Sequence, residues 1–129
     1  MQIPRDNWLP LEDSGITPEG RWESSARFGP SSEWFSGHFD EGPVVPGVAL
    51  LALAAEMVKG QGRVQGRLLR VAGFSRVRFK RLIFPDEKLH ISVAAMPPGP
   101  GAELDFHITC DGQRVAHGVM KAREEVSGG

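Results

Sequence analysis

The sequence has little of several things that would point to a secreted, membrane-bound or nucleic-acid-binding protein. Cys110 is the single cysteine among 129 residues, so an intrachain disulfide is excluded and a reducing cytoplasm is expected. No segment approaches the ~18 consecutive apolar residues of a membrane span. The first residues lack the basic start and apolar centre of a signal peptide. A net charge of −1 gives no general attraction to nucleic acid. We therefore expect a cytoplasmic protein that binds neither membranes nor nucleic acids.

The overall composition of the chain is that of a globular protein. Hydrophobic residues make up 40% of the chain and charged residues 24%, and a chain of this length can bury a single core. Phe106, Ile108 and Cys110 alternate along an expected strand. This spacing favours a buried, structural thiol over a nucleophile.

We divide the chain into three parts. Residues 1–16 are predicted to be an extension with weak structure, residues 17–124 to form the domain, and residues 125–129 to be a disordered tail. One long helix is predicted over residues 46–59, because Pro46 suits a first helical turn and Gly60 suits the position just after a helix. Its body is apolar on nearly all sides, which is typical of a buried helix.

The rest of the domain is predicted to consist of strands. Strand patterns cover residues 18–28, 67–83, 88–96, 103–110 and 113–123, and the dipeptide Asp111-Gly112 predicts a tight hairpin turn between the last two. One buried helix with a run of antiparallel strands predicts the α+β class. Strand patterns alone do not choose among α+β sheets.

The loop before the helix holds the strongest candidate site. His38 lies among glycines and prolines, and the helix begins directly behind it. Histidine titrates near pH 6.5, and the first backbone N–H groups of a helix are free to hold a developing oxyanion. The structural alternative is a loop histidine bound to the backbone. Asp40 lies close in sequence, but no third ligand has suitable spacing, so we expect no metal.

Two segments together resemble the FabA/FabZ type of 3-hydroxyacyl-thioester dehydratase, which has a hot-dog fold: an antiparallel sheet wrapped around one central helix. The first is Gly37-His38-Phe39, followed by Pro43-Val44 and Pro46-Gly47-Val48. The second runs from Arg76 to Arg81 and continues through Phe84-Pro85-Asp86-Glu87-Lys88-Leu89. The resemblance covers roughly residues 18–123.

The resemblance implies roles for residues around this loop. His38 would remove the α-proton of a 3-hydroxyacyl thioester, and the N–H of Gly47, with Val48 beside it, would bind the thioester carbonyl. An acyl tunnel would be lined by Trp34, Phe35 and Phe39. The implied partner is an acyl carrier protein or a coenzyme A thioester, with a homodimer or larger homo-oligomer as the assembly and no cofactor.

One position departs from the family pattern. The family carries an acid five residues after the glycine of the PGV motif, commonly facing the histidine across a dimer interface, but here that residue is Ala52. Glu56 lies one turn later on the same helix face, about 6 Å further along the axis. Burying a carboxylate in an apolar helix costs free energy unless the group has a partner. Two explanations for Glu56 remain open: catalysis, or a salt bridge to an arginine.

A basic stretch follows the helix. No acidic residue occurs between Met57 and Pro85, and alternation predicts Arg76, Arg78 and Lys80 on one strand face. With Arg81, they are candidates for docking an anionic carrier. The alternative is a solvated face paired with the acids of the N-terminal part.

These observations lead to a dehydratase-like acyl-thioester lyase, with His38 as base and Glu56 as the substitute acid. Two other functions stay open. One is a hot-dog thioesterase, in which Glu56 or Asp40 activates water. The other is a catalytically reduced acyl-binding subunit that needs a homologous partner.

Overall fold

The computed structural model describes residues 10–29 and 44–125. Within these ranges the chain forms one helix, α2 (Gly47–Gln65), and six strands. The strands are β1 (Leu11–Ile16), β2 (Trp22–Ala26), β3 (Leu69–Phe79), β4 (Leu89–Val93), β5 (Gly101–Cys110) and β6 (Gln113–Glu124). The predicted disordered tail falls mostly on residues 126–129, which lie outside the described ranges.

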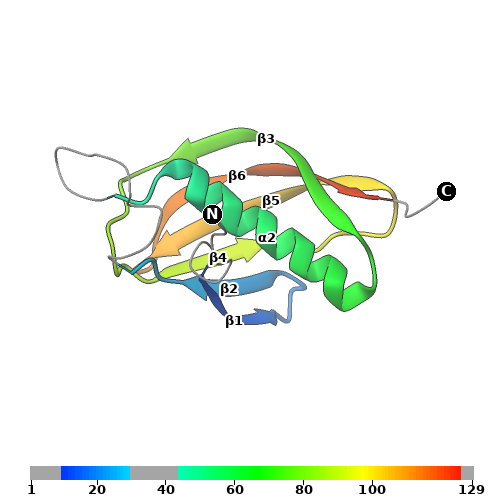
Figure 1. Cartoon of the computed structure of the whole chain (residues 1–129), viewed down its shortest axis with the longest axis horizontal. Coiled ribbons are helices and arrows are strands. Elements are labelled where there is room, and N and C mark those ends of the chain that lie inside the picture. Colours follow the sequence, from blue (N-terminus) through cyan, green and yellow to red (C-terminus); the bar gives the residue numbers. More distant parts are fainter. Residues whose placement is uncertain (1–9, 30–43, 126–129) are drawn as a thin grey trace, which may run out of the picture.

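The six strands form one antiparallel sheet in the order β1-β2-β4-β5-β6-β3. Figure 1 shows α2 lying across one face of this sheet, with β1 and β3 at opposite edges. The predicted α+β architecture, with a sheet wrapped around one central helix, is confirmed. No described helix has both the length and the apolarity needed to cross a membrane.

The core lies between α2 and the sheet. Leu53, Ala54 and Val58 of the helix are fully buried, as are Ile91 of β4 and Ile108 of β5. The apolar sequence of the helix had suggested burial on all sides, but the structure shows that the burial is incomplete. Val48 is 62% exposed and Val64 71% exposed, so the described chain leaves part of the apolar helix surface uncovered.

The predicted end of the helix is wrong. The helix passes through Gly60 and ends at Gly66, which adopts a left-handed conformation with φ 70° and donates its N–H to the carbonyl of Gly62. The intervening turn is held by buried Gln61, whose side-chain amide donates to Ala94 O at 3.0 Å and accepts from Met96 N–H at 2.7 Å. These tertiary bonds outweigh the ~1 kcal/mol that a mid-helix glycine costs.

The prediction of weak structure for residues 1–16 is also wrong where the structure can be compared. Leu11–Ile16 form β1, paired antiparallel with β2. The strand has a shifted register between Glu12 and Gly15, and Asp13 adopts φ 53°. This bulge breaks the period-2 alternation from which a strand is predicted. Residues 1–9 lie outside the described ranges.

The hairpin prediction is confirmed. Asp111 and Gly112 have φ values of 52° and 78°, the two positive values that a type I′ turn requires. Cys110, directly before the turn, is 1% exposed, as predicted for a structural thiol. Its burial, together with the nearby carboxylate of Glu87, raises the pKa of the thiol and disfavours the reactive thiolate.

Candidate functional site

The start of α2 is open to a ligand in a way that its end is not. Pro46 precedes the helix in an extended conformation and provides no side-chain cap, and the first turn holds no acidic residue. The N-terminal N–H groups of a helix have no intrahelical acceptor and carry partial positive charge. Within the described part of the chain, the N–H of Ala49 donates to Pro46 O at 2.9 Å, and the donors of Gly47 and Val48 and the helix dipole stay available for an anion.

Gly47 allows a close contact at this end of the helix. A β-carbon at position 47 would lie 2.8 Å from the nearest ring carbon of Phe79, which ends β3. Phe79 is itself 48% exposed. The glycine thus lets the ring of Phe79 pack closely against the helix start, and this structural role is compatible with the predicted role of its N–H.

The segment that carries the predicted base is joined to the described chain at two fixed points. His38, Trp34, Phe35 and Phe39 lie outside the described residues. On one side of this segment Phe28 O accepts the N–H of Asp86 at 2.8 Å, and on the other Val45 donates its N–H to Ile83 O at 2.7 Å. Both attachments therefore fall on residues 83–86.

Glu87 holds this attachment segment together. Its carboxylate accepts the N–H of Phe84 at 2.8 Å, the guanidinium of Arg81 at 3.0 Å and the thiol of Cys110 at 3.7 Å. The hydrogen bond from Arg81 is the main cause that lowers the pKa of Glu87, opposed by desolvation and helped by the Phe84 N–H. The predicted docking role of Arg81 thus competes with this internal ion pair.

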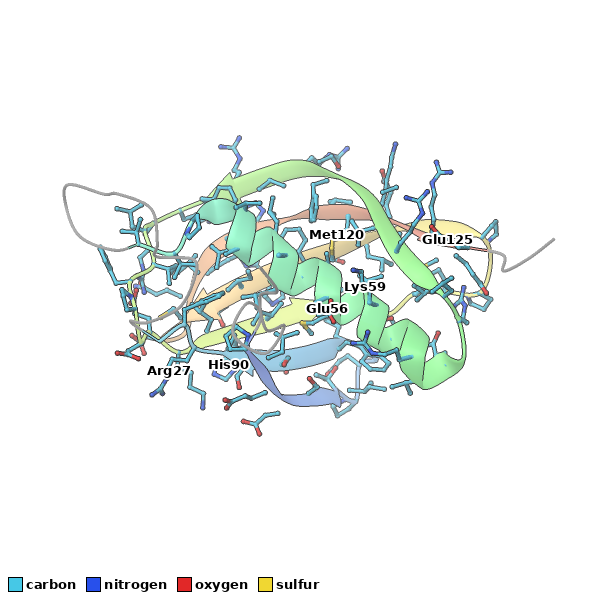
Figure 2. The ribbon with its side chains drawn as sticks, in the orientation of Figure 1. Arg27, Glu56, Lys59, His90, Met120 and Glu125 are labelled. Carbon is cyan, nitrogen blue, oxygen red and sulfur yellow. The ribbon has the colours of Figure 1, made fainter. Side chains whose placement is uncertain are left out.

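The two helix positions considered for the acid differ in their surroundings. Ala52 is half-buried, and by helical rise it lies about 8 Å along the axis from Gly47. Glu56 lies midway along α2 (Figure 2), about 14 Å from Gly47 by the same measure. Its carboxylate is 3.2 Å from the guanidinium of Arg63. The structure thus gives Glu56 the arginine partner that the structural alternative requires.

Glu56 also borders a cavity of about 370 Å³ on the side of the helix near β1 and β2. Leu11, Trp22 and Met57 supply apolar walls. The residues around this cavity do not include Gly47, Val48 or Phe79, so it is separate from the helix start.

The four predicted docking residues do not form one group. Arg76 and Arg78 line a common depression, whereas Lys80 follows the end of β3 and Arg81 is bound to Glu87. The expected alternation from Arg76 to Arg78 is interrupted, because Arg76 adopts φ 54° at a bulge in β3.

Five charged or titratable residues of that depression were not predicted as site residues from the sequence: Arg21, Asp105, His107, Arg114 and His117. A hairpin turn at residues 111–112 alone would place His117 opposite Phe106, on the helix side of the sheet. A register shift after Thr109 instead pairs His117 with His107 and buries both Val115 and Ala116. The bulge therefore turns His117 to the outer face. The hairpin signal gives the register near the turn but does not reveal a bulge further along.

Comparison with known proteins gives a family. A family profile described as ApeI-like, ApeI dehydratase, matches residues 15–119. Two curated relatives are 3-hydroxyacyl-[acyl-carrier-protein] dehydratases called FabZ. That of Lactococcus lactis subsp. cremoris is 33% identical over 70% of this chain and 66% of its own length. That of Bacillus subtilis is 36% identical over 63% of this chain and 65% of its own length. The chain thus spans about two thirds of the length of these relatives.

Solved structures support the fold. A chain of the dehydratase heterocomplex ApeI:P from Xenorhabdus doucetiae superposes with a TM-score of 0.72 at 16% identity, covering 98% of this chain and 94% of that one. The PaaI protein of E. coli gives a TM-score of 0.71 at 19% identity, covering 94% of this chain and 83% of that one. The predicted hot-dog fold is confirmed.

Proposed function

Because this chain belongs to the ApeI-like dehydratase family, we propose that it takes part in the dehydration of 3-hydroxyacyl thioesters. The observation that carries the proposal is the uncapped helix start at Gly47, which directly follows the segment bearing His38. His38 would take the α-proton, and the Gly47 N–H would hold the negative charge that develops on the thioester oxygen. The hydroxyl group then leaves as water after receiving a proton from an acid, and a C2–C3 double bond forms.

The source of that acid distinguishes two versions of the proposal. In the first, Glu56 of this chain leaves Arg63 and donates the proton. In the second, a homologous partner subunit supplies a carboxylate, because Ala52 stands where the family carries its own. The ion pair of Glu56 with Arg63 and its distance of about 14 Å from Gly47 favour the second version. The same version fits the fold relative that is described as a dehydratase heterocomplex.

Hydration of a 2-enoyl thioester, measured with the purified chain alone and with a homologous dehydratase subunit added, tests both versions. His38→Ala should lower the rate by roughly 100-fold or more. Unchanged hydration in that variant, or no hydration under either condition, would refute the proposal. Glu56→Gln is compared with Arg63→Gln: loss of activity only in the first variant assigns the acid to Glu56, and activity only with the partner assigns it to the partner.

Thioester hydrolysis is followed in the same samples as release of free thiol. This measurement addresses the thioesterase alternative, in which Glu56 or Asp40 would activate water. Two solved structures called hypothetical thioesterases from Streptococcus pneumoniae share the fold at TM-scores of 0.67 and 0.69, and their 15–16% identity carries no activity to this chain. Thiol release that is abolished in Glu56→Gln would favour hydrolysis over dehydration.

We also propose that a second hot-dog chain, identical or homologous, covers the side of β3 that faces α2. Phe74 is 39% exposed and Phe79 48% exposed on this edge strand, and Val48 of the helix start is 62% exposed. Burying three such side chains would favour association. An acyl carrier protein or coenzyme A would bring the thioester, with Arg76, Arg78, Lys80 and Arg81 as proposed carrier contacts, in a cytoplasmic setting.

A further inference from the structure

The outer face of the sheet, turned away from α2, carries a basic depression whose lining includes Arg76 and Arg78, two of the proposed carrier contacts. It has a volume of about 740 Å³, within the range of small-molecule sites. Its charged and titratable lining comprises Arg21, Arg76, Arg78, Asp105, His107, Arg114 and His117. We refer to these seven residues and the space that they enclose as the outer basic depression.

The strand register explains how these side chains come together. On β5, Leu104, Phe106 and Ile108 are buried against the helix, so Asp105 and His107 face outward. His107 pairs with His117 on β6, and His117 pairs with Arg78 on β3. Directly opposed residues have β-carbons about 5 Å apart. Two imidazoles and a guanidinium thus stand in one row across three strands.

The depression is basic because its positive groups outnumber its acids. Asp105 is the one carboxylate in the lining, and it is 3.0 Å from Arg21. Arg21 is further fixed by a 2.7 Å hydrogen bond from its Nε to Ser92 Oγ. Arg76, Arg78 and Arg114 make no ion pair with any residue in 10–29 or 44–125. Three guanidinium groups are therefore available to an anion.

The bulge in β3 that forms part of this surface contains a residue with a strained backbone conformation. Arg76 adopts φ 54°, a conformation that is uncommon outside glycine. The bulge around it brings Val77 over Gly118, where a β-carbon would lie 3.0 Å from Val77 Cγ2 and from the ring of Phe106. Burial lowers the pKa of His107, and Arg114 and Arg21 act in the same direction, whereas Asp105 and Glu23 oppose the shift. Like charges that oppose one another across strands destabilise a sheet, so this cluster does not serve the stability of the fold.

We propose that the outer basic depression binds the diphosphate group of a nucleotide-sized phosphate ester. Arginine forks match phosphate oxygens with two parallel hydrogen bonds. Three such forks around a concave site suit adjacent phosphates better than a single carboxylate. A hollow of this volume also fits a small ester better than the flat surface of an acidic protein. The site shares Arg76 and Arg78 with the proposed carrier contacts, but its binding of phosphate does not require the dehydration itself, because it lies on the opposite face of the sheet from α2.

Calorimetric titration of the full chain with inorganic pyrophosphate and with ADP tests the proposal. Both should bind, with ADP at least as tight as pyrophosphate, and Arg114→Gln should weaken both by roughly tenfold or more. Arg123→Gln is the matched control, because Arg123 is an exposed arginine of the same strand outside the depression. Thermal unfolding of each variant verifies that it is folded.

Four results would overturn the assignment. The first is no binding of either phosphate by the native chain, and the second is equal binding by the Arg114→Gln and Arg123→Gln variants. The third is binding of an acidic carrier protein that Arg114→Gln abolishes while neither small phosphate binds, which would make the surface a protein dock. Binding of pyrophosphate without ADP would also overturn the assignment, because the site would then not accept a nucleotide-sized ester. Because each readout is binding, failure here and failure of the enoyl-thioester assay are separate outcomes.

Discussion

The two ends of α2 are held in different ways. At its C-terminal end, polar groups of the chain pair with one another, and Gly66 caps the helix. The guanidinium of Arg67 binds the carboxylate of Glu124 at 2.9 Å. It also donates to the carbonyls of Pro97 and Gly99, at 3.2 and 2.9 Å. At its N-terminal end no side chain of residues 10–29 or 44–125 caps the helix, and a β-carbon at Gly47 would meet the half-exposed ring of Phe79.

This difference separates a structural end of the helix from the end that is proposed to bind the substrate. Backbone groups that are paired within the protein stabilise the fold and have no capacity left for a ligand. Unpaired N–H groups at a helix start contribute less to stability and remain able to hold an anion. Substitutions at the C-terminal end should therefore change stability, and substitutions at the N-terminal end should change activity.

The largest expected effect is on stability, at the closed end. In Gly62→Ala the new β-carbon would overlap the carbonyl oxygen of Arg67 and press on Leu69. Because the obstacle is backbone, relief requires movement of the helix end, and we expect a loss of about 3 kcal/mol in the free energy of unfolding. Denaturant unfolding monitored by circular dichroism measures this loss.

Gly60→Ala is the matched control within the same helix. Its β-carbon would meet only the distal Nη2 of Arg63, at 3.7 Å, so the gain in helix propensity should leave the protein as stable or up to about 1 kcal/mol more stable. Equal losses of unfolding free energy in the two variants would show that tight packing does not stabilise the C-terminal end of α2.

A comparable effect, this time on activity, is expected at the open end. Proline is tolerated at a first helical position but lacks the N–H. In a Phe79→Leu background, which makes room for a side chain, Gly47→Pro should retain the fold while lowering the hydration rate by about 100-fold, the usual effect of removing one oxyanion donor.

The control is Gly47→Ala in the same Phe79→Leu background, which adds a β-carbon but keeps the N–H. Its rate should stay within a few-fold of that of Phe79→Leu alone. If the alanine and proline variants lose activity equally, the loss comes from shape rather than from the N–H, and Gly47 has no oxyanion role.

The same contrast explains which parts of the helix could be predicted from the sequence. The start was predictable because Pro46 acts locally, through its fixed φ. The end was not, because Gly60 is a stop signal only in the absence of tertiary contacts. The side chain of Gln61 bonds to Ala94 and Met96, which lie more than 30 residues away. A signal that depends on distant partners cannot be recognised from local sequence.

Bulges account for most of the remaining differences. The alternating pattern identified β5 and β6, but it did not predict the register shifts next to Asp13, Arg76 and Val115. One extra residue reverses which face every later side chain occupies. This reversal places His117 in the outer basic depression, so the site was hidden although each of its residues was visible in the sequence.

The smallest expected effect concerns pH and the attachment of the open end. Arg81 lowers the pKa of Glu87 in the folded protein, so the ionised carboxylate binds its partners and stabilises the fold above the ordinary glutamate pKa. This stabilisation is lost as the pH falls through the lowered value, because the folded protein must then take up the proton. Glu87→Gln should lower the free energy of unfolding by about 1 kcal/mol at pH 7, and its melting temperature should depend less on pH below about pH 4.5.

Amide exchange should accelerate at Val45 and Asp86 before it does at Gly66 and Arg67. The control variant Glu19→Gln, in an exposed turn, should follow the native profile of melting temperature against pH. A Glu87→Gln profile parallel to the native one would mean that the two ends of α2 do not differ in their response to pH.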